Sequence, residues 1–206
     1  RGWFYSLLAV STLVEGESSY KRVLCLGHIL DADGQKMSKS RGNVIQPEEI
    51  LDKQGADALR WFLFATQNPW SPRRFSAEMV DEVVRKFLLT LWNTYSFFTV
   101  YANIDGFDPT QRTVPLAERP LLDRWLLGEL NRVVGVVTEG LEDYDATSTS
   151  RAIQQFVDDL SNWYVRRSRR RFWKSESDAD KLAAYHTLYE ALVTVAKLMA
   201  PYAPFV

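Results

Sequence analysis

The chain has little of several features that would identify a protein class at once. Its 206 residues include one cysteine, Cys25, which excludes a disulfide framework and a cysteine-rich zinc site. Twenty-five basic residues nearly balance 26 acidic ones, so a surface for nucleic acid has to come from local clustering. No segment approaches the roughly 18 consecutive apolar residues of a membrane span. These features are typical of a cytoplasmic protein that does not bind membranes.

What the sequence does have is the apolar content of a folded protein, with 46% hydrophobic and 13% aromatic residues. Residues 3–14 carry apolar side chains at helical spacing. Residues 22–30 form a short apolar run that predicts a buried strand followed by a turn. Because the pattern is already under way at Arg1, we interpret the chain as an excerpt from a longer protein.

Proline and glycine divide the next part of the chain. Pro47 begins a short predicted helix that Gly55 stops, and Asp57 is a candidate N-cap of the following helix. The sequence NPWSP at residues 68–72 is the clearest break, and we place a domain boundary there.

Beyond this break the sequence predicts four long helices with one apolar face each. Ser76 is a candidate N-cap of the first, and Ser177 with Asp180 begins the last. The apolar stripes are Val80, Val83, Val84, Phe87, Leu88, Leu91 and Tyr95; Leu122, Leu126, Leu130, Val133, Val134 and Val137; Ile153, Phe156, Val157, Leu160 and Tyr164; and Leu182, Tyr185, Leu188, Leu192, Val195 and Met199. Such helices bury these faces against one another, which predicts a bundle. Three tryptophans on apolar faces are expected in the core: Trp61, Trp92 and Trp125.

The segment DADGQKMSKSRGNV, residues 31–44, places Lys36 and Lys39 three residues apart among hydroxyl groups. Flexible ammonium groups suit phosphate chemistry, because they can follow an oxyanion as charge moves along a triphosphate. Serine hydroxyls and backbone N–H groups beside a glycine add donors. For an arbitrary pair of lysines, a solvated basic turn is the commoner explanation.

The five letters KMSKS, followed by GNV at 42–44 and GADALR at 55–60, resemble the class I aminoacyl-tRNA synthetases. The resemblance implies a loop that closes over ATP, with Lys39 stabilising the pyrophosphate leaving group and Lys36 binding phosphate. The implied ATP-binding set is Lys36, Met37, Ser38, Lys39 and Ser40, in which the serines shape the loop and donate hydrogen bonds.

The same resemblance implies a mainly α architecture. Residues 1–68 would be the C-terminal part of a Rossmann-type α/β catalytic domain, and residues 69–206 a helical-bundle anticodon-binding domain truncated at its C-terminus. The sequence GHIL at 27–30 matches only part of the family's HIGH signature. We therefore expect His28 to be a strand or pocket-edge residue and the true signature to lie outside the chain.

A second unusual stretch runs from Arg166 to Lys174, with six cations and no acid. Continued at 100° per residue, the preceding apolar stripe passes through Arg167 and Arg171. Unpaired guanidinium groups beside aromatic rings suit RNA backbone contacts and base stacking. The predicted tRNA-binding residues are Arg166, Arg167, Arg169, Arg170, Arg171, Trp173 and Lys174. Two alternatives remain open: a solvated helix end, and a role for some arginines at the domain junction.

The sequence DDLSNWYVRRSRRRFW at 158–173, with residues 87–102 and 121–131, resembles isoleucyl-tRNA synthetases, especially the type shared by eukaryotes and some bacteria. The resemblance implies a monomeric parent enzyme that activates isoleucine with ATP and Mg²⁺ and transfers it to tRNA(Ile). Zinc would bind, if at all, elsewhere in the parent, and no metal ligand is predicted in this chain. We expect the isolated segment to be inactive. A valyl or leucyl enzyme and a non-catalytic helical RNA-binding module remain as alternatives.

Overall fold

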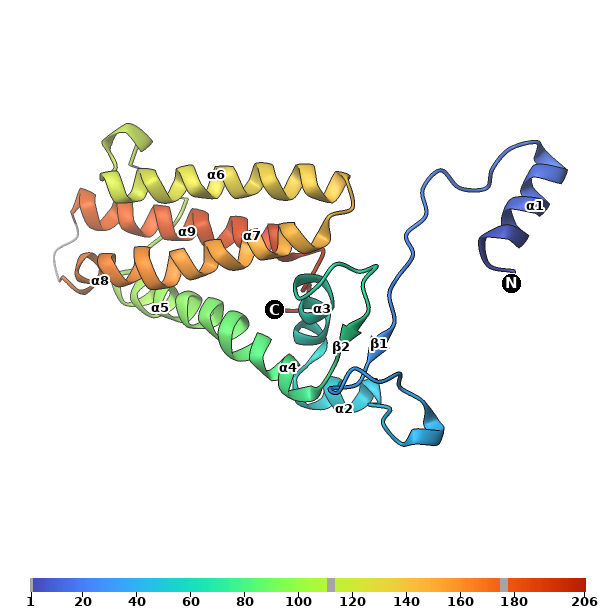
Figure 1. Ribbon diagram of the computed structural model, residues 1–206. Coiled ribbons are helices and arrows are strands. Elements are labelled where there is room, and N and C mark those ends of the chain that lie inside the picture. The colour runs from blue at the N-terminus through green and yellow to red at the C-terminus, as the bar shows by residue number, and fades with distance from the viewer. Residues whose placement is uncertain (1, 111–113, 175–177) are drawn as a thin grey trace.

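A computed structural model describes residues 2–110, 114–174 and 178–206. Figure 1 shows a helical bundle, a small region beneath it that carries two short strands, and an N-terminal arm that extends away from both. The elements in chain order are α1 Trp3–Glu15, β1 Ile29–Leu30, the 3₁₀ turn η1 Lys39–Arg41, α2 Pro47–Lys53, α3 Ala56–Ala65, β2 Arg73–Arg74, α4 Ala77–Val83, the π-helical segment η2 Val84–Leu88, α5 Leu89–Asp105, the 3₁₀ turn η3 Leu116–Glu118, α6 Leu121–Glu142, α7 Ala146–Asp158, the π-helical segment η4 Asp159–Val165, α8 Arg166–Trp173 and α9 Ala179–Met199.

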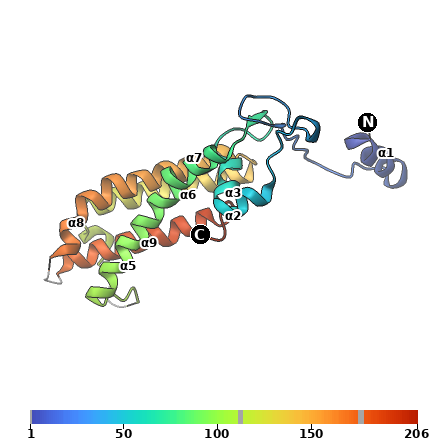
Figure 2. The ribbon, with the colours of Figure 1, turned by 90° about the horizontal axis from the view of Figure 1, so that it is seen from below.

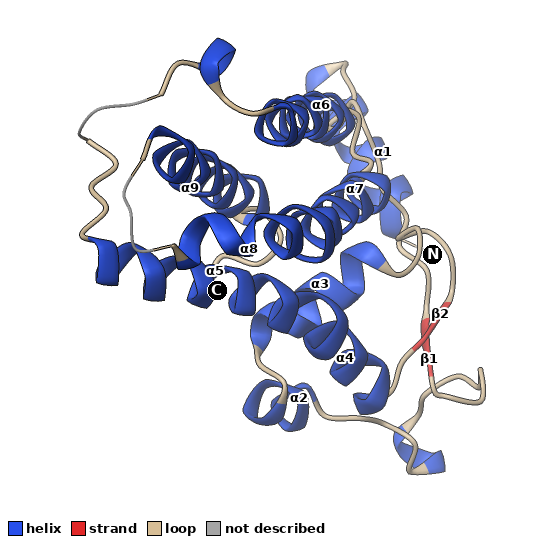
Figure 3. Cartoon of the chain, turned by 90° about the vertical axis from the view of Figure 1, so that its left-hand side faces the viewer, coloured by secondary structure: helices blue, strands red, loops and turns tan. Residues whose placement is uncertain are grey.

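The bundle confirms the prediction of four packed helices. Figure 3 views it nearly end-on, with α5, α6, α9 and the continuous helix α7–η4–α8 around a common core. That core includes Leu126, Val133, Ile153, Leu160 and Leu188, all of them buried. Fully burying a side chain of this size stabilises the fold by about 1.5–3 kcal/mol, so the apolar stripes hold the bundle together.

Acidic and hydroxyl side chains begin three of the helices. Ser76 Oγ accepts a hydrogen bond from the Met79 N–H at 3.3 Å, which confirms this cap. Asp145 caps α7, and Asp178 caps α9 by accepting from the Lys181 N–H at 2.7 Å. The predicted start at Ser177 lies outside the described residues.

The predicted cap at Asp57 is wrong. Gly55, with φ 87°, already makes the turn that begins α3, so Asp57 falls in the first helical turn instead of before it. Its buried carboxylate accepts a hydrogen bond from the Phe205 N–H at 2.9 Å. Asp57 therefore ties α3 to the C-terminal end of the described chain.

The expectation of a buried strand over residues 22–30 is also wrong. Only Ile29 and Leu30 form a strand, which pairs in parallel with Arg73 and Arg74 of β2, while residues 22–26 are exposed. An apolar run is buried as a strand only when neighbouring elements cover it, and the described residues supply only the short strand β2. His28, expected as a strand or pocket-edge residue, directly precedes β1; its side chain is exposed, and its carbonyl oxygen accepts a hydrogen bond from the Arg73 N–H at 3.0 Å.

The three tryptophans differ from one another. Trp61 is fully buried and stacks on Phe87 with ring centroids 4.0 Å apart, as predicted. Trp92 and Trp125 are 54% and 36% exposed, so their assignment to the core is wrong. Helical periodicity identifies the apolar side of a helix, but a tryptophan at the margin of that side stays partly solvated.

Helix α3 packs against the bundle as well as against the strand region. Arg60 donates to the carbonyl oxygens of Tyr202 and Pro201 at 2.8 and 2.9 Å, and Arg151 of α7 donates to those of Ala65 and Thr66 at 2.9 and 2.6 Å. Because α3 follows the lysine-rich loop after the short helix α2, these bonds connect this part of the chain to the bundle.

The N-terminal arm has few contacts with the rest of the chain. Figure 2 shows α1 well separated from the bundle. The helix itself confirms the periodicity of residues 3–14, but its apolar side chains, such as Tyr5 and Leu13, are exposed. No helix among the described residues has the length and hydropathy to cross a bilayer.

Candidate nucleotide and RNA sites

The lysine loop begins in a tight turn after β1. Asp31 Oδ1 accepts hydrogen bonds from the N–H groups of Asp33 at 3.1 Å and Gln35 at 2.7 Å, and Gly34 supplies the positive φ of 83°. The turn brings Lys36 back beside Leu30. Hydrogen bonds to its carboxylate, first from Asn43 and then from Gln35, lower the pKa of Asp31 below its ordinary value of 3.8.

Asn43 closes the loop at its base. Its Nδ2 donates to Asp31 Oδ2 at 2.7 Å, and its Oδ1 accepts from the Ser38 N–H at 2.9 Å. Met37 packs against a small apolar cluster that contains Ile50 and Phe62. One amide side chain and one thioether therefore anchor the base of the loop, while its tip projects outward.

The five predicted residues run from the base of the loop, where Met37 packs, to its tip. Lys39 begins a 3₁₀ turn that ends at Gly42 in the left-handed region, with φ 66°, and Ser38 Oγ lies 3.2 Å from Ser40 Oγ. Lys36 and Lys39 are exposed, and no group among the described residues accepts a hydrogen bond from either ammonium. The tip thus presents two unneutralised charges and two hydroxyls to solvent, a donor set for a polyphosphate.

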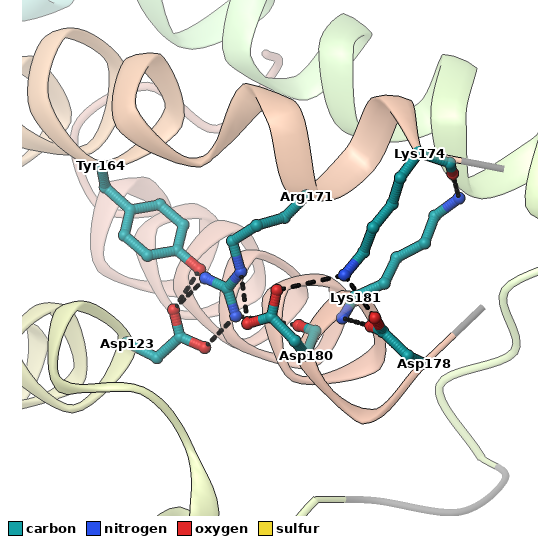
Figure 4. Close-up of polar contacts among 7 residues, drawn as sticks. All are labelled: Asp123, Tyr164, Arg171, Lys174, Asp178, Asp180 and Lys181. Atoms are coloured by element: carbon teal, nitrogen blue, oxygen red, sulfur yellow. Dashed lines mark hydrogen bonds and ion pairs between the residues drawn. The ribbon is translucent and has the colours of Figure 1, made fainter. Parts of the chain in front are cut away.

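In the arginine run, the structure gives Arg171 an intramolecular partner (Figure 4). Its guanidinium makes a bidentate pair with Asp123 of α6, Nη1 to Oδ1 at 2.6 Å and Nη2 to Oδ2 at 2.8 Å. Its Nε also lies 2.9 Å from Asp180 Oδ1, and Tyr164 donates to Asp123 at 3.0 Å. The Arg171 side chain is 15% exposed and that of Asp123 is 0% exposed. Arg171 therefore fastens α8 to α6 and α9.

These contacts set the electrostatics of the cluster. Burial alone would lower the pKa of Arg171, but Asp123 and Asp180 raise it overall. Burial and the charge of Asp123 raise the pKa of Tyr164. Both raised pKa values keep the Arg171 guanidinium charged and the Tyr164 phenol neutral.

Lys174 is held in the same cluster. Its ammonium donates to Asp178 Oδ2 at 2.6 Å and to Asp180 Oδ2 at 3.3 Å, and these contacts, Asp178 foremost, raise its pKa. The acids that neutralise this end of the run come from the start of α9, beyond the stretch with no acid. The structure thus gives both Arg171 and Lys174 a task within the fold, and their predicted contact with RNA has no support in this geometry.

The remaining cations lie on the surface. Arg166, Arg167, Arg169 and Arg170 are exposed, and Arg167 lies over the Trp163 ring at 4.4 Å from its centroid. The expectation that Arg167 continues the apolar face is wrong, because Ser168 takes that buried place. The π-helical segment η4 accommodates an inserted residue, and this shifts every later residue around the helix.

Sequence reasoning missed Asp123 and Asp180 as partners of the run. Asp123 stands three residues before Leu126 on the apolar face of α6. A charged residue on such a face is seldom buried unless it is paired. The position of Asp123 was therefore the available signal for a buried cationic partner. Trp173 is exposed, as its predicted role requires.

Comparison with known proteins identifies two matching families. Residues 1–71 match the family described as tRNA synthetases class I (I, L, M and V), and residues 123–206 match the anticodon-binding domain of tRNA ligase. An isoleucine–tRNA ligase of Dehalococcoides mccartyi is 60% identical over 206 residues, and one of Thermobifida fusca is 54% identical over 209. Each comparison covers all of this chain, which spans 20% of either relative.

Solved structures show the same fold at lower identity. A methionyl-tRNA synthetase of Mycobacterium tuberculosis, in complex with methionyl-adenylate, matches with a TM-score of 0.77 at 24% identity, over 96% of this chain and 39% of that one. A LeuRS–tRNA–LeuAMS ternary complex from Agrobacterium radiobacter matches with a TM-score of 0.72 at 19% identity, over 98% of this chain and 24% of the other.

The lysine loop, the bundle and these matches define the class: the chain belongs to the class I aminoacyl-tRNA synthetases. Valine, leucine and methionine enzymes share that class. The whole-chain identities of 50–60% are with isoleucine–tRNA ligases, and the chain spans about a fifth of the length of these relatives.

Proposed function

We propose that the parent enzyme activates isoleucine with ATP and transfers it to tRNA(Ile), and that this segment supplies the ATP-closing loop and part of the RNA-binding surface. The observation that carries the proposal is the loop tip. It exposes Lys36 and Lys39 without a protein partner, in a chain 60% identical to an isoleucine–tRNA ligase.

In this proposal the loop acts on the triphosphate. When ATP reacts with the isoleucine carboxylate, charge builds on the departing pyrophosphate, and Lys39 would stabilise it there while Lys36 holds a phosphate oxygen. The anchored base confines movement to the tip, so that both ammonium groups can close over the nucleotide together. Magnesium would accompany the ATP phosphates.

The bundle would hold the tRNA through its exposed cations. Arg166, Arg167, Arg169 and Arg170 offer guanidinium groups to phosphates, and Trp173 offers a ring to an unpaired base. Arg171 and Lys174 would act indirectly, by holding α8 in place. The proposal includes a monomeric, cytoplasmic parent.

Pyrophosphate exchange by the full-length parent tests the catalytic part. Isoleucine should support exchange, whereas valine and leucine should support much less. Lys39→Ala should lower the exchange rate by about 10²–10³-fold, since one preorganised donor contributes about 2.7–4 kcal/mol to the transition state. Lys53→Ala, at an exposed lysine that ends α2, is the matched control and should exchange normally.

Each other result points to an alternative. Exchange that depends on valine or leucine would assign the parent to a sibling ligase. A normal rate in Lys39→Ala would leave the segment as a helical RNA-binding module without a catalytic loop. The 206-residue segment alone should show no exchange, because the nucleotide fold and the amino-acid pocket need the rest of the parent.

A further inference from the structure

A cleft lined by basic side chains lies between the lysine loop and the bundle. It has a volume of about 840 Å³ and runs between the end of α3, strand β2, the α4–η2 helix and α7. Arg73, Arg74, Lys86 and Arg151 line it. Among its described lining residues the one acid is Glu82, which pairs with Lys86 at 2.6 Å. The cleft therefore carries excess positive charge.

Arg73 is the most telling residue in this cleft. It is 6% exposed, and its guanidinium donates to the carbonyl oxygens of Leu63 and Gln67 but pairs with no carboxylate among the described residues. Its burial lowers the pKa of Arg73. A buried cation without a counter-charge is costly, so a site built around one favours an incoming anion.

The cleft opens toward both sites described above. At one end, Arg74 lies against the turn before the lysine loop, so close that a Cβ on Gly34 would come within 3.2 Å of its Nε. At the other end, a second hollow of about 530 Å³ shares Lys86 and Arg151 and continues along α7 to Asn162 of η4. The acid among its described lining residues is Asp158, which accepts a hydrogen bond from Asn162 at 2.6 Å. The exposed Arg166 stands one turn beyond Asn162.

We propose that this cleft binds phosphodiester groups of the tRNA backbone, as a third contact between the exposed arginines and the lysine loop. The inference rests on the proposed function and adds residues to its RNA-binding surface. A nucleic-acid strand suits the site, because cations from β2, η2 and α7 follow one another along an open path. A single carboxylate from the rest of the parent would neutralise one of them and leave the others.

The test is tRNA binding by the full-length parent, measured by filter binding of a tRNA(Ile) transcript between 50 and 200 mM salt. The variants are Arg74→Gln and Lys86→Gln, at exposed side chains. Log K falls as log salt rises, and each variant should make this negative slope shallower by about 0.7–0.9. The double variant should make it shallower by about twice that amount. Arg132→Gln is the matched control. Arg132 pairs with Glu129 of its own helix at 2.8 Å, as Lys86 pairs with Glu82, and the salt slope of this variant should equal that of the unmodified parent.

Two outcomes would overturn the inference. In one, both cleft variants keep the salt slope of the unmodified parent while Arg166→Gln makes the slope shallower. That result would confine RNA binding to α8. The other is an unchanged slope together with a lower melting temperature, which would assign the cleft to an acidic segment of the parent. Isoleucine-dependent exchange by the unmodified parent is scored separately, so a failure of the proposed function is distinguishable from a failure of the cleft.

Discussion

The pairing of Arg171 with Asp123 yields the strongest prediction about stability. In Arg171→Met, a volume-conserving change, the fully buried carboxylate of Asp123 would keep Tyr164 as its hydrogen-bond donor but lose both bonds from the guanidinium. Breaking a buried ion pair from one side costs about 3–5 kcal/mol, because the remaining charge has no water to solvate it. Urea unfolding of the chain, followed by circular dichroism, should show that loss as a lower midpoint.

Two further variants separate this effect from a general loss of charge. Arg169→Met removes an exposed cation from the same helix and should change the free energy of unfolding by less than about 0.5 kcal/mol. The double variant Asp123→Leu with Arg171→Met removes both charges, and it should be more stable than Arg171→Met alone. The reasoning is refuted if Arg171→Met unfolds at the same urea concentration as Arg169→Met.

Three other predictions follow from close approaches and caps. Gly140→Ala should destabilise the bundle by about 1–3 kcal/mol in urea unfolding, because its Cβ would lie 2.4 Å from a threonine methyl of α7, whereas Gly135→Ala, with open space around it, should be neutral or stabilising. Asp145→Ala should cost about 1 kcal/mol at pH 7 and nothing in strong acid. The N-cap bonds hold the pKa of Asp145 below 3.8, so its contribution is present above that pH and is lost as the pH falls through the folded-state value. Gly27→Ala should separate β1 from β2, since a Cβ there would lie 2.3 Å from the backbone oxygen of Ser71, and limited proteolysis should then cut the arm faster.

The helices could be predicted because their signals are local. Residues that repeat every three or four positions, such as Leu126, Leu130 and Val133, mark a buried face without knowledge of what covers it. The KMSKS segment was equally visible, since its meaning lies in five adjacent letters. The clasp made by Asn43 was not, because its two partners stand five and twelve residues away and only the folded loop brings them together.

Two failures have a different cause, which is structure outside the residues concerned. Whether residues 22–26 are a strand depends on neighbouring strands, and the described residues offer only β2. The direction of Arg167 depends on the π-helical segment before it, since one inserted residue turns the helix by about 100°. A 3.6-residue period cannot report such an insertion.

Helix α3 connects the lysine loop to the proposed RNA-binding surface. It follows the lysine loop after the short helix α2, its middle places Trp61 in the bundle core, and its last carbonyls accept hydrogen bonds from Arg73 and Arg151. Those two arginines also line the basic cleft, so an RNA phosphate bound there would lie against the groups that fix the end of α3. The loop base and the proposed RNA-binding surface therefore share one rigid element, and their relative position is set by packing instead of by a flexible linker.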